Sequence, residues 1–231
     1  MSDITPAEWT AILLSLRVAV IATLVATPFG IALAWLLARY SFWGKSVLDA
    51  LVHLPLVLPP VVTGYLLLLT FGKRGLVGAW LADHLGIVFA FRWTGAALAC
   101  GVMSFPLLVR PIRLSIEAID RRLEQAASTL GAAPWKVFAT VTLPLALPGI
   151  LAGMVLGFAK AIGEFGATIT FVSNIPGETQ TISSAIYSLI QTPDGDAAAL
   201  RLVVVSVVIA MAALIGSEWF ARRATQRLHG N

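Results

Sequence analysis

The chain has 231 residues, of which 58% are hydrophobic and 12% are charged, and its formal net charge is +4. Soluble domains usually carry about 25% charged residues, so this composition excludes an ordinary soluble domain. The single cysteine excludes an intrachain disulfide, and the three histidines share no spacing typical of a metal site.

Long stretches without Asp, Glu, Lys or Arg recur along the chain. A bilayer core requires about 20 apolar residues in a helix, because backbone groups in lipid must bond within their own segment. Residues 18–38, 50–72, 93–109, 137–159 and 202–217 meet this description. Residues 165–190 are apolar but interrupted by Asn174, Pro176 and Gly177, which leaves a sixth, short or re-entrant segment open. The sequence therefore predicts an all-α polytopic membrane protein with five spanning helices, or six.

The distribution of Lys and Arg predicts the orientation of these spans, because basic residues concentrate on the cytoplasmic side. With the N-terminus outside, ten basic residues fall on the inner side and five on the outer side. The inner set is Arg39, Lys45, Arg110, Arg113, Arg121, Arg122, Lys136, Arg222, Arg223 and Arg227, and the outer set is Arg17, Lys73, Arg74, Arg92 and Arg201. We therefore expect an outer N-terminus, an inner C-terminus and a cytoplasmic loop at about residues 113–144.

The second predicted span, within "HLPLVLPPVVTGYLLLL", contains the prolines Pro55, Pro59 and Pro60. Proline removes a backbone donor and kinks a helix. Transporters tend to place pathways and moving joints at interrupted membrane helices. The three prolines are therefore candidates for functional helix kinks, and kinks that only help the helices to pack are the alternative.

Apolar residues in the cytoplasmic loop recur with helical spacing from Ile116 to Leu130. Glu117 and Arg121 are four apart, as in an ion pair on the opposite side of one helix. Gly131 stands where a helix C-cap favours a residue with positive φ. The loop therefore predicts a helix that ends at this glycine.

Pro134 follows the glycine and suits the first turn of a second helix. Trp135, Phe138 and Val141 would form its apolar face, and Pro144 would mark the return into the membrane. Two short amphipathic helices at an angle follow from this pattern. A surface loop that lies on the membrane is the alternative.

Residues 159–193 place two charges in an otherwise apolar stretch. Lys160 and Glu164 share a helix face and can neutralise one another, and an intramembrane ion pair is by default a functional candidate. A dianion that crosses lipid needs hydrogen-bond donors and close backbone approach. The neighbouring residues that offer these features are Gly163, Gly166, Thr168, Thr170, Ser173 and Asn174. A structural pair that holds two helices together is the alternative.

The cytoplasmic loop resembles the EAA loop of type I ABC-importer permeases. The matching positions are Gln125, Ala126, Ala127, Gly131, Val141, Leu143 and Pro144. Gln125 replaces the acidic residue of that pattern, and Glu124 lies one position earlier. The resemblance implies that residues 113–144, which we call the coupling loop, sit in a cleft of a separate ATP-hydrolysing subunit.

Residues 53–69, 103–120 and 159–193 resemble the molybdate permease subunits of bacterial ABC importers, and the resemblance extends from about Trp9 to Trp219. It implies the type I permease fold and import of molybdate by alternating access. Sulfate and thiosulfate permeases share the Leu-Pro-rich second span and the Gly-Glu-Phe-Gly sequence at residues 163–166. A permease for sulfate/thiosulfate or for tungstate therefore stays an alternative.

The same resemblance implies one permease domain over residues 1–231, with a core at about residues 10–220. It implies a homodimer in the bacterial inner membrane, two cytoplasmic ATPase subunits and a periplasmic molybdate-binding protein. ATP and Mg would be used by the ATPase subunits, and this chain would bind no cofactor, metal or nucleic acid. An integral membrane enzyme, the remote alternative, would need clustered acid, base or metal groups, and the sequence offers no catalytic residue of this kind.

Overall fold

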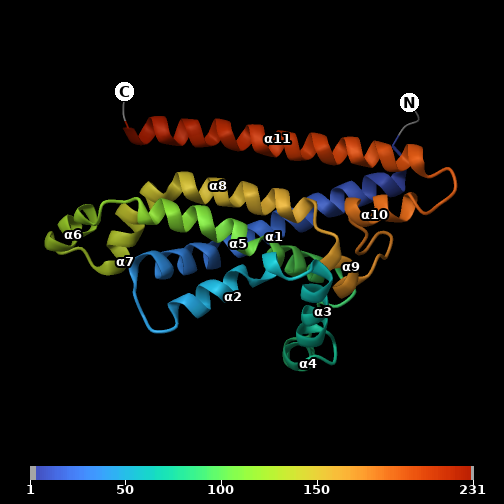
Figure 1. Ribbon diagram of the computed structural model, residues 1–231, viewed down its shortest axis with the longest axis horizontal. Coiled ribbons are helices and arrows are strands. Elements are labelled where there is room, and N and C mark those ends of the chain that lie inside the picture. The colour runs from blue at the N-terminus through green and yellow to red at the C-terminus, as the bar shows by residue number, and fades with distance from the viewer. Residues whose placement is uncertain (1–3, 230–231) are drawn as a thin grey trace.

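The computed structural model describes the backbone of residues 4–229 and the side chains of residues 4–216. The longest helices are α1 (Pro6–Arg39), α5 (Trp93–Glu117), α8 (Leu143–Ile162) and α11 (Asp196–His229), and they run along one axis (Figure 1). Within the described residues, four helical segments are long and apolar enough to cross a membrane: Pro6–Arg39, Trp93–Glu117, Pro134–Ile162 and Asp196–Gly216. Four of the five predicted spans are thus continuous helices. The side chains of Arg222, Arg223 and Arg227, from the predicted inner set, lie outside the described residues.

The predicted second span is broken into two helices. α2 (Lys45–Val57) and α3 (Pro60–Phe71) meet at an angle of 115°. Leu58 has an extended backbone, and Pro60 occupies the first turn of α3, where its missing N–H removes no helical bond. α1 ends and α5 begins at opposite ends of the molecule, so α2, α3 and α4 (Leu76–Leu85) carry the chain between these ends (Figure 1). The bent pair gives a fifth crossing if its two helices form one span, and the predicted interruption of this span lies at Leu58 and Pro59.

Residues 165–190 contain two short helices, α9 (Gly166–Val172) and α10 (Ile182–Leu189). At 1.5 Å per residue these helices are only about 10–12 Å long, far short of a bilayer core. Neither of them qualifies as a membrane span among the described residues. α9 and α10 lie at the end of the molecule where α1 begins (Figure 1).

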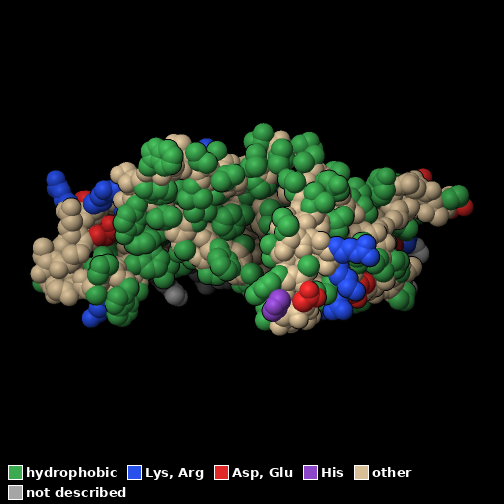
Figure 2. Space-filling view, turned by 90° about the horizontal axis from the view of Figure 1, so that it is seen from below, with side chains coloured by type: hydrophobic (Ala, Val, Ile, Leu, Met, Phe, Trp, Pro, Cys, Tyr) green, Lys and Arg blue, Asp and Glu red, His purple; other side chains and the backbone are tan. Residues whose placement is uncertain are grey.

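The core is centred on α5, which packs between α1 and α8. Small residues allow this close approach, as is usual for membrane helices. A Cβ atom on Gly153 of α8 would lie 2.5 Å from the carbonyl oxygen of Leu108 in α5. On the outside of the bundle, hydrophobic side chains cover the middle of one face, and the charged side chains gather mainly toward its two ends (Figure 2). This distribution is typical of a membrane-embedded bundle.

α11 is much less embedded than α5, with 11% of its most apolar window buried against 61% for α5. Its first turns are tied to the start of α1 by a guanidinium–carboxylate contact. Arg201 donates to Glu8 Oε1 from Nη2 at 2.7 Å and from Nε at 3.1 Å. Glu8 also closes the capping box of α1, because its Oε2 accepts from the Thr5 N–H at 2.6 Å.

The coupling loop contains α6 (Arg121–Thr129), α7 (Pro134–Val137) and a π-helical turn, η1 (Phe138–Thr142), which runs directly into α8. The first predicted helix is wrong in its extent, since Ile116 belongs to α5 and Asp120 caps the start of α6. The second is not a separate helix, because Pro134–Ile162 is one continuous segment. Pro144 therefore lies inside a helix that begins ten residues earlier, and its role as the point of return into the membrane stays a prediction. The π turn ends two residues before this proline.

Candidate coupling and pathway sites

The outer surface of the coupling loop is uncovered and presents several apolar side chains among polar ones. α6 has no buried residue, so nothing in the described chain packs fully over it. Leu123, Leu130 and Trp135 are 50%, 88% and 73% exposed. Ala126 beside them is also exposed, and its small side chain permits close approach of another surface. An amphipathic helix with such a surface is suited to bind in a groove of a partner protein.

The turn after α6 depends on Gly131, which has a φ of +85°. The Ala132 N–H bonds to the Ala127 carbonyl at 3.2 Å, and the Gly131 N–H bonds to the Ser128 carbonyl at 3.0 Å. A Cβ atom on Gly131 would meet nothing within 4 Å. Glycine is therefore favoured by the backbone conformation rather than by lack of space.

The inner surface of α6 is held by Glu124, whose contacts the sequence did not predict. Glu124 Oε1 accepts from Arg39 Nη2 at 3.0 Å and from Thr142 Oγ1 at 2.6 Å. Its Oε2 lies 3.0 Å from Arg39 Nε. Gln125, at the acidic position of the EAA pattern, is exposed. The acid that the pattern places at 125 is thus present at 124, and it faces the bundle.

The remaining coupling-loop residues lie where η1 joins α8. Val141 is half-buried in the π turn, Leu143 packs against the core, and Pro144 is exposed. Ala127 is half-buried on α6. These residues shape the base of the coupling loop rather than its exposed surface.

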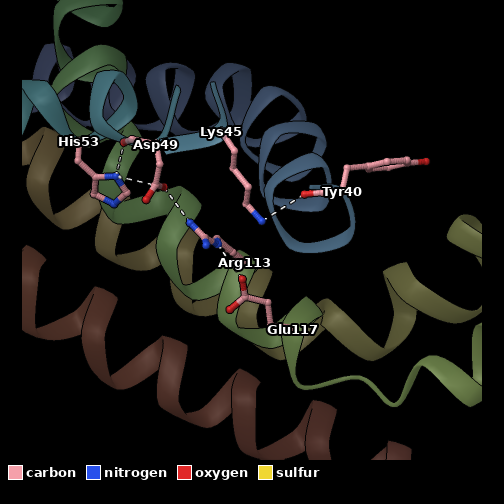
Figure 3. A network of polar contacts seen from close by, with 6 residues as sticks. All are labelled: Tyr40, Lys45, Asp49, His53, Arg113 and Glu117. Atoms are coloured by element: carbon pink, nitrogen blue, oxygen red, sulfur yellow. Dashed lines mark hydrogen bonds and ion pairs between the residues drawn. The ribbon is translucent and has the colours of Figure 1, made fainter. Parts of the chain in front are cut away.

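A second polar network, also absent from the sequence-based prediction, joins α2 to α5 near the same end (Figure 3). Arg113 lies between two carboxylates: its Nη1 is 2.8 Å from Asp49 Oδ1, and its Nε is 2.8 Å from Glu117 Oε1. His53 Nδ1 lies 2.8 Å from the Asp49 carbonyl oxygen. The predicted pair of Glu117 with Arg121 is wrong, because α5 ends at Glu117 and its partner lies one turn earlier in the same helix.

Lys160 and Glu164 form the predicted ion pair, with Lys160 Nζ 2.7 Å from Glu164 Oε2. They do not share a helix face as predicted, because α8 ends at Ile162 and Glu164 lies in the link to α9. Their environments differ sharply, since the Glu164 side chain is 1% exposed and the Lys160 side chain 29%. Glu164 Oε1 also accepts from the Ala167 N–H at 3.0 Å, so the carboxylate caps the start of α9. Lys160 is therefore the member of the pair that can reach a solute.

The hydroxyl groups of α9 bond within their own helix. Thr168 Oγ1 donates to the Phe165 carbonyl and Thr170 Oγ1 to the Gly166 carbonyl, each at 2.8 Å. These protons are unavailable to an anion in this conformation, contrary to the expectation for free donors. Asn174 Nδ2 donates to Ser188 Oγ at 2.6 Å, while Ser173 is exposed.

α9 lies tightly against α3, and glycines make the contact. A Cβ atom on Gly64 would lie 2.5 Å from the Ala167 carbonyl oxygen, and one on Gly166 would lie 2.7 Å from Pro60 Cβ. Pro60 begins α3 immediately after Pro59, whereas Pro55 lies within α2. Gly163 is exposed at the end of α8. Pro60, Gly64 and Gly166 thus meet where α3 packs on α9, just beyond the end of α8, which we call the junction of α3, α8 and α9.

Comparison with known proteins assigns this arrangement to a family. The family described as "Binding-protein-dependent transport system inner membrane component" matches residues 26–226. The chain is 61% identical over 224 residues to the molybdenum transport system permease protein ModB of Escherichia coli (strain K12), covering 97% of this chain and 98% of the relative. It is 38% identical over 197 residues to the sulfate transport system permease protein CysT of the same strain, covering 85% of this chain and 70% of the relative.

A solved structure confirms the predicted permease fold. The crystal structure of a bacterial alginate ABC transporter in complex with an alginate pentasaccharide-bound periplasmic protein matches with a TM-score of 0.75. The match covers 96% of this chain and 81% of that chain at 20% sequence identity, so the likeness concerns the fold alone.

Proposed function

The chain belongs to the family of binding-protein-dependent transport system inner membrane components, and we propose that it is the membrane-spanning subunit of an ATP-driven molybdate importer. The observation that carries this proposal is 61% identity to a molybdenum permease over 97% of the chain. Identity to the sulfate permease is 38%, which favours molybdate over sulfate as the substrate. Within this function the chain is a transport subunit and not an enzyme.

The coupling loop supplies the mechanical contact of this importer. The exposed Leu123, Leu130 and Trp135 form an apolar surface that fits the groove of a cytoplasmic ATPase subunit. ATP and Mg are used by that subunit, and Gly131 sets the angle at which the coupling loop enters it. Two copies of this chain, each with one ATPase subunit, would enclose a pathway, since a closed two-fold arrangement is the commonest for such assemblies.

The pathway runs past the junction of α3, α8 and α9. Movement of the coupling loop would alternately expose this junction to each side of the membrane. A periplasmic molybdate-binding protein delivers the oxyanion on the outer side, where α9 and α10 lie in the proposed orientation. The partly exposed ammonium of Lys160 offers a passing dianion a weak contact, and weak contacts permit release.

The proposed orientation places the N-terminus in the periplasm and the C-terminus in the cytoplasm. The coupling loop and the end of α11 lie at one end of the molecule, and the start of α1 lies at the other (Figure 1). The basic residues are more numerous toward the coupling-loop end, in line with the positive-inside rule. The whole chain then acts as one permease domain, with its core at about residues 10–220 and the coupling loop at residues 113–144.

The test is uptake of radioactive molybdate by the complete complex in proteoliposomes. ATP is enclosed in the lumen, and the binding protein is added outside. Excess unlabelled sulfate and tungstate serve as competitors. We expect ATP-dependent uptake that excess sulfate leaves unchanged, and competition by tungstate would add tungstate as a second substrate. Uptake that sulfate abolishes at equal concentration would instead assign the chain to sulfate transport.

A further inference from the structure

We propose that Glu124 is a positioning residue that locks the coupling loop to the inner end of α1 through Arg39, so that α6 and α1 move together. The expected effect on molybdate transport rests on the proposed function. The expected effect on the orientation of α6 does not. It gives the displaced acid of the EAA pattern a role that does not require contact with the ATPase subunit.

The contact joins three elements that are distant in sequence. Arg39 ends α1, Glu124 lies on α6, and Thr142 ends η1. Arg39 donates from Nε and Nη2 to Glu124, and Thr142 Oγ1 donates to the same carboxylate. The side chains of Arg39 and Glu124 are 9% and 18% exposed, so water screens their attraction less than it screens a surface pair.

α6 has little else that fixes its orientation. No residue of α6 is buried, so it lacks the hydrophobic packing that normally orients a helix. Among the described side chains, the bonds of Glu124 are the only side-chain hydrogen bonds that join α6 to α1 or η1. The orientation of α6 therefore depends on one carboxylate.

The surroundings of this contact leave room for movement. A cavity of about 540 Å³ lies between α1, α6 and η1, beside Glu124. Trp35 of α1 and Phe138 of η1 both line it and pack edge to face, with ring centroids 5.5 Å apart. α6 borders this cavity and would tilt if the contact of Glu124 with Arg39 were lost, because few packed atoms would resist the motion.

The geometry predicts that Glu124 affects the coupling of ATP hydrolysis to transport but not the binding of the ATPase subunit. Glu124 faces the bundle, whereas the apolar surface of Leu123 and Leu130 faces outward. Glu124→Gln should therefore keep the ATPase subunit bound and ATP hydrolysis intact. Molybdate transported per ATP hydrolysed should fall about tenfold, within the usual range of coupling between two sites.

The test compares Glu124→Gln, the charge swap Arg39→Glu/Glu124→Arg, and the control Asp49→Asn in the purified complete complex. The control weakens the ion pair of Asp49 with Arg113 at the same end of the molecule; Asp49 lies outside the coupling loop, and this pair does not touch α6. We measure bound ATPase subunit, ATP hydrolysis, molybdate transported per ATP and hydrogen exchange of the amides of residues 121–133. We expect faster exchange in Glu124→Gln, partial recovery in the swap, and wild-type values in the control.

Three results would overturn the proposal: unchanged exchange in Glu124→Gln, no recovery in the swap, or loss of the ATPase subunit from Glu124→Gln. The last would mean that the acid itself contacts the ATPase. If the wild-type complex fails to import molybdate, the proposed function is wrong. Hydrogen exchange and ATP hydrolysis still decide whether the lock exists, so the two failures are distinguishable.

Discussion

The ion pair of Lys160 and Glu164 allows a structural role to be separated from a role in transport. Each residue can be neutralised alone or together, by Lys160→Met, Glu164→Gln and the double variant. The two single variants should differ in stability because the partners differ in burial, at 29% and 1% exposure. The double variant leaves no charge without a partner.

The expected loss of stability in each variant depends on which charged group remains and whether that group still has a partner. Lys160→Met leaves the Glu164 carboxylate buried with one remaining bond, from the Ala167 N–H, and loss of one partner of a buried pair costs about 3–5 kcal/mol. Glu164→Gln leaves an ammonium that can reach water or lipid headgroups, and we expect a cost of about 1–2 kcal/mol. The double variant keeps an acceptor for the Ala167 N–H and should lose about 1 kcal/mol or less.

Transport should not follow this order if Lys160 contacts the oxyanion. A hydrogen bond to a charged group contributes roughly 1.5–3 kcal/mol, so its loss should slow uptake by about tenfold or more even when the fold is intact. We would measure the thermal stability of each complex, its abundance in the membrane and its molybdate uptake per assembled complex. The matched control is Glu8→Gln/Arg201→Met, which neutralises a similarly buried pair at 6% and 22% exposure, away from the junction of α3, α8 and α9.

The outcome that refutes this reasoning is a double variant with wild-type uptake per assembled complex. The pair would then only hold α9 to the end of α8. An equal loss of uptake in the Glu8 and Arg201 control would also refute it, because the effect would then not be specific to the pathway.

Three further predictions concern the turn, the helix contact and the topology. Gly131→Val should strain the turn, where φ is +85°, by about 1 kcal/mol or more, and should reduce co-purification of the ATPase subunit. The control Gly177→Val, at a similar φ of +80°, should leave co-purification unchanged. Gly64→Ala places a Cβ atom 2.5 Å from a backbone oxygen of α9, so thermal stability and uptake should both fall, and a fully stable variant would contradict the contact. In a cysteine-free background, an impermeant thiol reagent should label Leu76→Cys but not Trp43→Cys in intact cells. Both sites are strongly exposed, so the reverse pattern would invert the proposed orientation.

The features that the sequence predicted well are those that depend on local composition or on one backbone torsion angle. Charge-free stretches identify membrane helices because lipid excludes unpaired charges, whatever the helices contact. Gly131 identifies a turn because a left-handed residue favours glycine in any surroundings. Lys160 and Glu164 meet because they are only four residues apart, although Glu164 lies just beyond the end of α8.

The features decided only by the tertiary structure involve competing partners or directions in space. Glu124 binds Arg39, which lies 85 residues away in sequence, and no spacing rule reaches that far. Glu117 had two basic residues at a spacing of four, and the end of α5 determined that Arg113 is its partner. The prolines of the second span indicated a break, but only the structure gives the bend of 115° and the close packing of α3 on α9. Local sequence limits what each segment can form, whereas the choice among partners is made by the free energy of the assembled bundle.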